Sequence, residues 1–409
     1  MKPLGPIPPY FTALKGELAI GGRTASSLVK EARRTPVFVY SRDIIASRIE
    51  ALRAAMPERL HIHYAMKANP YAPLLEFIAD HVDGLDIASG GELELARKAG
   101  YLAREISFAG PGKRDPELKT AIATGVTLNC ESAGEIERAL MLGKALSVKP
   151  RLAIRVNPSF ELRGSGMKMG GGAKPFGIDE DQVPALARKI VDEGADWRGF
   201  HIYTGSQALD PLAIIETQAN VLKLAARLAE DAGVDVPHLN MGGGFGIPYF
   251  DKDKTLDIEA VGTALGQAFE DLPDCLKETQ FAIELGRYLV GEAGVYLTQV
   301  VDKKVSHGVT YLVTDGGLHH QLAASGNFGT VVRRNYPVAI ASRFEADLEP
   351  EEVNVIGCLC TPLDRLADNA LLPRAEIGDL IAVFCAGAYG ASASPATFLG
   401  QGPAAELLV

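Results

Sequence analysis

The regular alternation of short apolar segments with amphipathic helical segments is the feature that most restricts the fold of this chain. Helical patterns such as those at 91–100, 133–143 and 217–233 separate the apolar segments. Strands that alternate with helices form parallel sheets, and eight consecutive units favour a closed (β/α)8 barrel over an open sheet. The eight expected strands are LHIHYA (60–65), VDGLDIA (82–88), EISFAG (105–110), VTLN (126–129), RLAIRV (151–156), RGFHIY (198–203), HLNMG (238–242) and FAIEL (281–285).

The character of the sequence changes at about residue 290. The runs GVYLTQVVDKKV, VTYLVTDGG, VVRRNYPVAI, EVNVIGC and DLIAVFCA are strand-like and are joined by turns, with little helical periodicity. They predict a separate, mostly β domain, and the isolated strand-like run TPVFVY (35–40) is expected to complete it. We therefore expect an α/β protein with an N-terminal segment at 1–56 that contributes to the β domain, a barrel at 57–288 and the β domain at 289–409.

Composition narrows the classes of function. The 409 residues are 47% hydrophobic and carry a formal net charge of −10, which argues against nucleic-acid binding because phosphate contacts need a basic face. The N-terminus lacks the apolar core of a signal peptide, and no stretch approaches the length of a membrane span. Five cysteines without paired CxxC spacing argue against a disulfide framework or a metal site. We expect a cytoplasmic protein.

A barrel carries its functional groups at the C-terminal ends of its strands. The segments that directly follow the eight expected strands are polar and glycine-rich: MKANP, SGGE, PGK, CES, NPSFE, TGSQ, GGFG and GRY. The opposite strand ends look ordinary. The sequence therefore predicts that the functional site lies on the C-terminal rim.

Lys67 and a glycine-rich loop are the first candidates on this rim. Lys67 follows the first strand, where a lysine commonly extends its charge into solvent; in a cofactor pocket the same amine can instead form an imine with an aldehyde. The loop MGGGFG (241–246) follows the seventh strand. It can present backbone N–H groups to a phosphate, with the Ser206 hydroxyl beside them, or it can be a flexible turn.

Several other motifs also permit two interpretations. Glu284 can pair locally with Arg287 or can bind a ring nitrogen of a cofactor. The CxC motif at 358–360 can supply two buried small side chains or a general acid. The glycine-rich stretch at 164–179 is either a binding lid or a disordered segment, and Tyr389 in GAYG either reaches a phosphate or simply packs.

Taken in order, these motifs resemble one family, the fold-type III decarboxylases that depend on pyridoxal 5′-phosphate (PLP) and include diaminopimelate, ornithine and arginine decarboxylases. The resemblance spans nearly the whole chain and implies an alanine racemase-like barrel, PLP as cofactor and an amino-acid substrate. It rests on FVY, YAMKANP, ASGGELELARKAG, RVNP, HIYTGSQ, NMGGGFGIPY, ELGRYLVGEAG, CTPLD and GAYG.

The resemblance also implies roles for individual residues. Lys67 is expected to hold PLP as a Schiff base, Glu284 to pair with the pyridine nitrogen, and Cys360 to reach in from the partner subunit of a homodimer and help protonate the carbanion. Substrate contacts are expected from Asp315, Thr361 and Asp364. The cofactor-binding set is expected to be Lys67, Arg155, His201, Tyr203, Ser206, Gly242, Gly243, Gly244, Glu284, Arg287 and Tyr389, with no metal.

Two departures from the family pattern bear on the substrate. Tyr203 stands where better-known members place a histidine that stacks on the ring, and His201 precedes it on the same strand face. Thr361 follows Cys360, where diaminopimelate enzymes carry CES and ornithine enzymes CDG, so it supplies no carboxylate for a distal amine. The chain is more similar to the subgroup of exosortase-associated decarboxylases and the carrier-protein-linked glutamyl decarboxylase of aminoglycoside assembly. A carrier-bound or otherwise modified amino acid is therefore a candidate substrate.

Three alternatives stay open at this level. Diaminopimelate decarboxylase proper is one, and a racemase on the same fold is another. Racemases of this fold place an arginine at the pyridine nitrogen, and Glu284 argues against that arrangement. The third is a non-catalytic PLP carrier; the small carriers lack the C-terminal β domain that CTPLD and GAYG occupy here.

Overall fold

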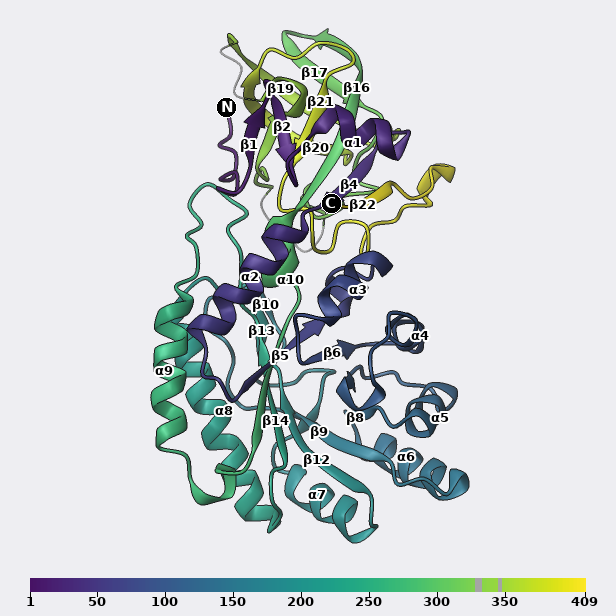
Figure 1. Ribbon diagram of the computed structural model, residues 1–409, viewed down its shortest axis with the longest axis vertical. Helices are drawn as coiled ribbons and strands as arrows, with labels where there is room; N and C mark the ends of the chain where they lie inside the picture. Colours follow the sequence, from purple (N-terminus) through teal and green to yellow (C-terminus); the bar gives the residue numbers. More distant parts are fainter. Residues whose placement is uncertain (328–332, 345–347) are drawn as a thin grey trace. The chain divides into compact units, whose positions relative to one another are not determined.

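The computed structural model describes residues 1–327, 333–344 and 348–409 (Figure 1). The chain forms two compact units. The barrel unit comprises Ile49–Gly246 and Leu256–Leu285. The β unit comprises Met1–Arg48, Ile247–Thr255 and Gly286–Val409.

The limits of these compact units differ in detail from the domain limits expected from the sequence. The N-terminal contribution to the β unit stops at Arg48 rather than at residue 56, and the segment Ile247–Thr255, which leaves the barrel after its seventh strand, belongs to the β unit. The C-terminal segment of the β unit begins at Gly286 instead of residue 289. The expected domain limits themselves stay a prediction.

The barrel unit contains eight parallel strands in a closed ring. Each strand pairs with the next one along the chain, and the last pairs with the first, so the predicted (β/α)8 barrel is confirmed. Within the ring, apolar residues alternate with polar ones, as the period of a strand requires. The strands are β5 (Leu60–Ala65), β6 (Gly84–Ile87), β7 (Ile106–Phe108), β8 (Thr127–Cys130), β9 (Arg151–Asn157), β12 (Asp196–Ile202), β14 (His238–Gly243) and β15 (Gln280–Leu285).

Helices alternate with the strands along the chain, the first of them preceding β5, and they cover the outside of the ring (Figure 1). Local sequence signals set their ends: Ser89 and Ser132 each accept a hydrogen bond from a backbone N–H of the first turn, and Gly125 and Gly233 end their helices in the left-handed conformation. The helices are α2 (Arg42–Ala55), α3 (Ala72–Ala79), α4 (Gly90–Lys98), α5 (Asp115–Thr124), α6 (Ala133–Leu146), α7 (Val183–Asp192), α8 (Pro211–Ala232) and α9 (Ile258–Glu270).

The β unit is built around the long strand β16 (Gly294–Ser306). β4 (Val37–Tyr40) pairs with it in antiparallel orientation, so the predicted N-terminal contribution to the β domain is confirmed. A strand that the sequence analysis did not identify, β22 (Ala405–Leu408), runs parallel to β4 and brings the C-terminal segment into the same sheet. The remaining larger strands are β17 (Val309–Thr314), β18 (Val338–Ile340), β19 (Pro350–Ile356), β20 (Arg365–Pro373) and β21 (Leu380–Val383).

The smaller elements of the β unit complete it. An N-terminal meander precedes helix α1 (Ala25–Ala32), and the short helix α10 (Arg287–Val290) opens the C-terminal part. The aromatic rings of Phe38 and Tyr296 pack 4.8 Å apart between β4 and β16, in the core of the sheet. The strand expected at 331–340 is present only as β18, and residues 331 and 332 lie outside the described residues. The meander is formed by β1 (Thr12–Leu14), β2 (Glu17–Ile20) and β3 (Arg23–Thr24).

Two glycines of α9 make a matched test of packing between helices. A Cβ atom on Gly262 would lie 1.8 Å from the carbonyl oxygen of Ala55, whereas on Gly266 its nearest neighbour would be Pro57 at 3.9 Å. We expect Gly262→Ala to lower the free energy of unfolding by about 1–3 kcal/mol through overpacking. Gly266→Ala is expected to raise it by up to about 1 kcal/mol through helix propensity. Urea unfolding measures both, and equal effects of the two substitutions would contradict this packing.

Candidate functional site

Lys67 lies on the C-terminal rim of the barrel. β5 ends at Ala65, and the single 3-10 turn Met66–Ala68 carries Lys67 out of the strand. Its Nζ atom lies 5.4 Å from the centre of the Tyr203 ring, which follows β12. The ammonium charge of Lys67 also acts on the carboxylates of Glu284 and Glu92. The structure therefore brings Lys67, Tyr203 and Glu284 together at this rim.

Glu284 is buried near the end of β15 and is held by two neighbouring strands. Its Oε2 atom lies 3.0 Å from Nε2 of His201 on β12 and accepts a hydrogen bond of 3.3 Å from the side-chain amide of Asn240 on β14. Burial raises the pKa of Glu284, but the charges of His201, Lys67 and Arg155 outweigh it and bring the pKa to about 2. The carboxylate is therefore an anion at neutral pH.

The glycine loop, which comprises the last two residues of β14 and Gly244, permits only glycine at each of its three positions. A Cβ atom on Gly243 would lie 1.9 Å from the carbonyl oxygen of Glu284, and one on Gly244 would lie 2.4 Å from that of Gly205. Gly242 and Gly244 also adopt positive φ angles of 70° and 89°. The close approach of Gly244 to Gly205 places the loop beside Ser206.

Ser206 supplies a hydroxyl with an unused hydrogen-bonding capacity. Within the part of the chain that the structure describes, its Oγ atom is buried and has no hydrogen-bond partner. A buried hydroxyl without a partner costs free energy unless a ligand or water satisfies it. Together with the backbone of the glycine loop, this hydroxyl forms a polar cradle that suits a phosphate group. The donor set thus fits the PLP phosphate.

Arg155 and Glu131 form a buried ion pair that the motif analysis did not assign. Arg155 Nη1 lies 2.8 Å from Glu131 Oε1, and Glu131 Oε2 accepts a 3.1 Å hydrogen bond from the backbone N–H of Gly177. Burial raises the pKa of Glu131, but the charges of Arg155 and Lys113 outweigh it, so the pKa is lowered. Glu131 stands in the CES segment after the fourth strand, so its place on the rim was the available signal.

The glycine-rich stretch at 164–179 is attached to the rim. Its short strand β10 (Met167–Lys168) pairs in antiparallel orientation with β13 (Gly205–Ser206), and Met167 stands opposite Ser206. The ring of Phe176 from the same stretch lies 5.3 Å from the guanidinium carbon of Arg155. The stretch therefore has defined contacts with the rim, and its role as a binding lid stays a prediction.

Arg287 and Tyr389 lie in the β unit and are close to each other. The guanidinium carbon of Arg287 is 4.7 Å from the centre of the Tyr389 ring, and Nη1 donates a 2.9 Å hydrogen bond to the hydroxyl of Tyr249, which the sequence analysis did not single out. Tyr389 has a φ angle of 57°, a strained value for a tyrosine. The phosphate-binding roles of Arg287 and Tyr389 stay predictions.

The expected catalytic cysteine lies in a turn of the β unit. Cys360 is exposed, and the Thr361 side chain accepts a 3.3 Å hydrogen bond from the backbone N–H of Leu363. Both carboxylate oxygens of Asp364 accept hydrogen bonds from backbone N–H groups, those of Leu318 and Leu359. Asp364 thus holds the turn that carries Cys360.

Asp315 is engaged within the β sheet. Its Oδ1 atom accepts hydrogen bonds from the Thr298 hydroxyl at 2.7 Å and from the Gln299 backbone N–H at 2.9 Å. Its Oδ2 atom accepts one from the hydroxyl of Thr35. These contacts support the junction of β16 and β17, and the expected substrate contacts of Asp315, Thr361 and Asp364 stay predictions.

Comparison with known proteins gives a consistent result. Residues 42–291 match the model of the pyridoxal-dependent decarboxylase, pyridoxal binding domain. The chain is 36% identical over 91% of its length to the decarboxylase of L-glutamyl BtrI acyl-carrier protein from Niallia circulans, covering 88% of that protein. It is 32% identical over 98% of its length to diaminopimelate decarboxylase from Archaeoglobus fulgidus, covering 93%.

The solved structures give the same picture. The crystal structure of diaminopimelate decarboxylase from Helicobacter pylori, complexed with L-lysine, superposes with a TM-score of 0.83 at 26% sequence identity. The match covers 94% of each chain. In the described residues of the present structure, no helix has the length and apolar character required to cross a membrane.

The low pKa of Glu284 predicts a pH-dependent contribution to stability in the PLP-free protein. A carboxyl group whose pKa is depressed by folding stabilises the native state above its unfolded pKa, and this stabilisation is lost as the pH falls through the folded pKa. We expect the stability difference between wild type and Glu284→Gln to be constant above about pH 5 and to shrink between pH 4.5 and about 2. Urea unfolding at several pH values measures it, and a constant difference throughout would contradict the assignment.

Proposed function

We propose that this chain, which belongs to the PLP-dependent decarboxylases of fold type III, removes CO2 from an amino acid that is bound to a carrier protein or otherwise modified. The enzyme class and the cofactor follow from the family; the substrate is the proposed part. Thr361 is the observation that carries it, because this residue leaves the turn after Cys360 without a carboxylate for a distal amine. The 36% identity to a decarboxylase of a carrier-linked glutamyl group supports the same substrate class.

The rim of the barrel contributes binding and electrostatics to this reaction. Lys67 would hold PLP covalently, and Ser206 with Gly242–Gly244 would bind its phosphate. When bound, PLP accepts the electron pair that the departing CO2 leaves behind. Glu284 would receive a hydrogen bond from the ring nitrogen, and its low pKa keeps it anionic, so the proton stays on that nitrogen.

His201, Asn240 and Tyr203 would orient these groups. His201 and Asn240 both contact Oε2 of Glu284, which fixes the carboxylate from two neighbouring strands. The Tyr203 ring lies close to Lys67 Nζ, where it can stack on a flat ligand bound there. A carboxylate rather than an arginine at position 284 does not favour the racemase alternative.

Arg155 is the proposed residue for the side of the cofactor ring. Its ion pair with Glu131 fixes the guanidinium, and the link from Glu131 to Gly177 couples that position to the 164–179 stretch. A segment held in this way can close over a bound ligand and exclude water. This arrangement suits a carrier-bound or modified substrate whose attached group lies along the 164–179 stretch.

We also propose that the enzyme is a cytoplasmic homodimer with shared sites, in which Cys360 of one subunit returns a proton to Cα of the product in the other. Exposure of Cys360 on the single chain supports this role. All five cysteines are free, which is consistent with a reducing compartment. The family resemblance implies such a dimer, and the proposed role of Cys360 depends on that resemblance.

A CO2-release assay tests the substrate and the role of Lys67 together. We expect release from a carrier-linked or acylated amino acid and little from free diaminopimelate, ornithine or lysine. Lys67→Ala should lower the rate by at least about 100-fold and lose the covalently bound cofactor, because alanine has no amine that can form the imine. Lys98→Ala, an exposed lysine on α4, is the matched control. Faster turnover of free diaminopimelate than of any modified substrate would overturn the substrate proposal.

Mixed dimers test the shared site. When Lys67→Ala and Cys360→Ala subunits are mixed, a hybrid dimer contains one site that carries neither substitution. We therefore expect activity to rise from near zero to about one quarter of the wild-type level after random subunit exchange, as expected when sites act independently. Activity is assayed after native mass spectrometry has confirmed the exchange. No recovery in a preparation with proven hybrids would refute shared sites.

A further inference from the structure

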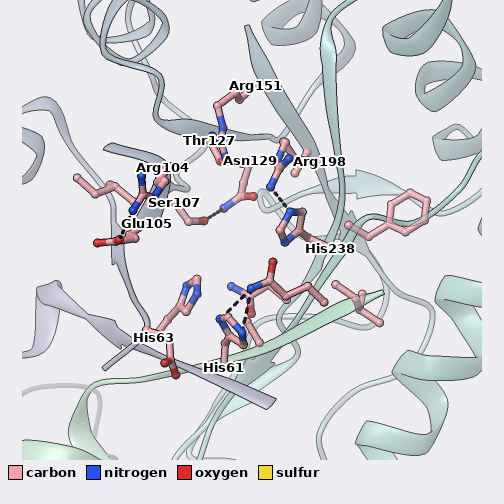
Figure 2. A pocket seen from close by; sticks show the side chains of 18 of the residues that line it. His61, His63, Arg104, Glu105, Ser107, Thr127, Asn129, Arg151, Arg198 and His238 are labelled. Carbon is pink, nitrogen blue, oxygen red and sulfur yellow. Dashed lines mark hydrogen bonds and ion pairs between the residues drawn. The ribbon is translucent and has the colours of Figure 1, made fainter. Parts of the chain in front are cut away.

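A polar cavity lies at the N-terminal end of the barrel, opposite the rim that carries Lys67. It has a volume of about 650 Å³ and lies between the beginnings of the barrel strands (Figure 2). The site around Lys67 lies beyond the other ends of the same strands. The polar side chains that bear on the argument are those of His61, His63, Arg151, Arg198, His238 and Gln280.

Two arginines give this cavity its charge. Arg151 begins β9 and Arg198 lies on the neighbouring strand β12. Their side chains are 21% and 20% exposed, so solutes can reach them while much of each guanidinium is desolvated. Within the described residues, the Nε atoms of both arginines are buried and have no hydrogen-bond partner. Two partly exposed guanidinium groups thus line one cavity.

The nearest acidic groups do not neutralise this charge. Asp196 lies 3.9 Å from Arg151 Nε and 3.6 Å from Arg198 Nη1, which is beyond hydrogen-bond distance, and its side chain is 42% exposed. Asp83 is committed to Arg53 at 3.0 Å and to the backbone N–H of Ile62 at 2.8 Å. Glu105, another carboxylate in the lining, lies 3.7 Å from Arg104, which lines the cavity as well. The cavity therefore keeps an excess of positive charge.

The positive charge also affects the pKa of His238, which lines the cavity. Burial, and then the charges of Arg198 and Arg151, lower the pKa of His238 to about 4, so its ring is neutral at pH 7. The ring accepts a hydrogen bond from Arg198, and Figure 2 shows Arg198 directed at it. Burial and the charge of Arg198 likewise lower the pKa of Arg151. Burial is the largest cause of both shifts, and the positive charge of Arg198 adds to each.

We propose that this cavity is a binding site for a phosphate-type oxyanion, held by the guanidinium groups of Arg151 and Arg198. An arginine presents a planar fork of N–H donors that matches phosphate oxygens, and the terminal N–H groups of these partly exposed side chains can contact a bound anion. His238 and the amide of Gln280 provide further polar contacts on the adjoining strands β14 and β15. Free phosphate and the phosphate group of a small metabolite share this chemistry.

The site is separate from the catalytic one, with one connection. Asn240 lines the cavity, and its side-chain amide also donates to Glu284 on the rim side. Since PLP brings its own phosphate to the catalytic end, binding must be measured with that end filled. The proposal is independent of the proposed amino-acid substrate, and its failure would leave that proposal unaffected.

Isothermal titration of the PLP-saturated enzyme tests the site. Inorganic phosphate and glycerol phosphate are titrated separately in phosphate-free buffer at constant ionic strength. We expect one saturable site per chain for inorganic phosphate, and an affinity at least about 10-fold weaker in Arg151→Gln and in Arg198→Gln. Arg188→Gln, an exposed arginine on α7 outside the cavity, is the matched control and should bind as wild type does. Tighter binding of glycerol phosphate would identify a phosphate monoester as the ligand.

Two observations keep the test independent of folding defects. Each variant should retain PLP and decarboxylase activity, because removal of one of two mutually repelling guanidinium groups does not disrupt the barrel. In the wild type, ³¹P NMR should show saturable broadening of the phosphate signal apart from the PLP resonance. Absence of saturable binding up to about 50 mM phosphate would overturn the proposal. Equal weakening in Arg188→Gln, or unchanged binding in both cavity variants, would overturn it as well.

Discussion

The parallel pairing of β15 with β5 closes the barrel, and the arrangement of the rim depends on this closure. It sets Glu284 opposite His63, so that the buried carboxylate and Lys67 lie at the ends of neighbouring strands although 217 residues separate them. The pairing of β14 with β15 then brings Gly243 opposite Glu284. Without ring closure, the amine, the carboxylate and the glycine loop would lie on distant edges of an open sheet.

The two ends of the same ring differ in how their charges are compensated. At the C-terminal end, buried charges have partners: Glu284 has His201 and Asn240, and Arg155 has Glu131. At the N-terminal end, Arg151 and Arg198 have only distant or exposed carboxylates. A buried cation without a partner is costly. The first end is where we propose that the family cofactor binds, and the second has the excess of positive charge that led us to propose an anion site.

Much of the fold was predictable because hydrophobic periodicity reports which faces are buried. All eight barrel strands were expected within a few residues of their observed bounds, and the contribution of β4 to the β sheet was expected as well. Strand β22 was missed since AELL is short and lies at the chain terminus. Glu131 and Asn240 were not assigned to the site, because the type of a residue does not show which side chain on another strand it will contact. The arginines and histidines of the N-terminal cavity were taken as ordinary strand ends for the same reason.

The sequence by itself determined the order and type of the elements, the lysine after the first strand and the glycines of the loop at 241–246. Those features are local: periodicity sets the strands, and backbone crowding of the kind seen at Gly243 tolerates no side chain. Only the tertiary structure decided that His201 and Asn240 share one oxygen of Glu284, that Glu131 holds Arg155, and that two arginines face one cavity. The physical reason is that charge compensation depends on distances between strands, and ring closure, rather than sequence spacing, sets those distances.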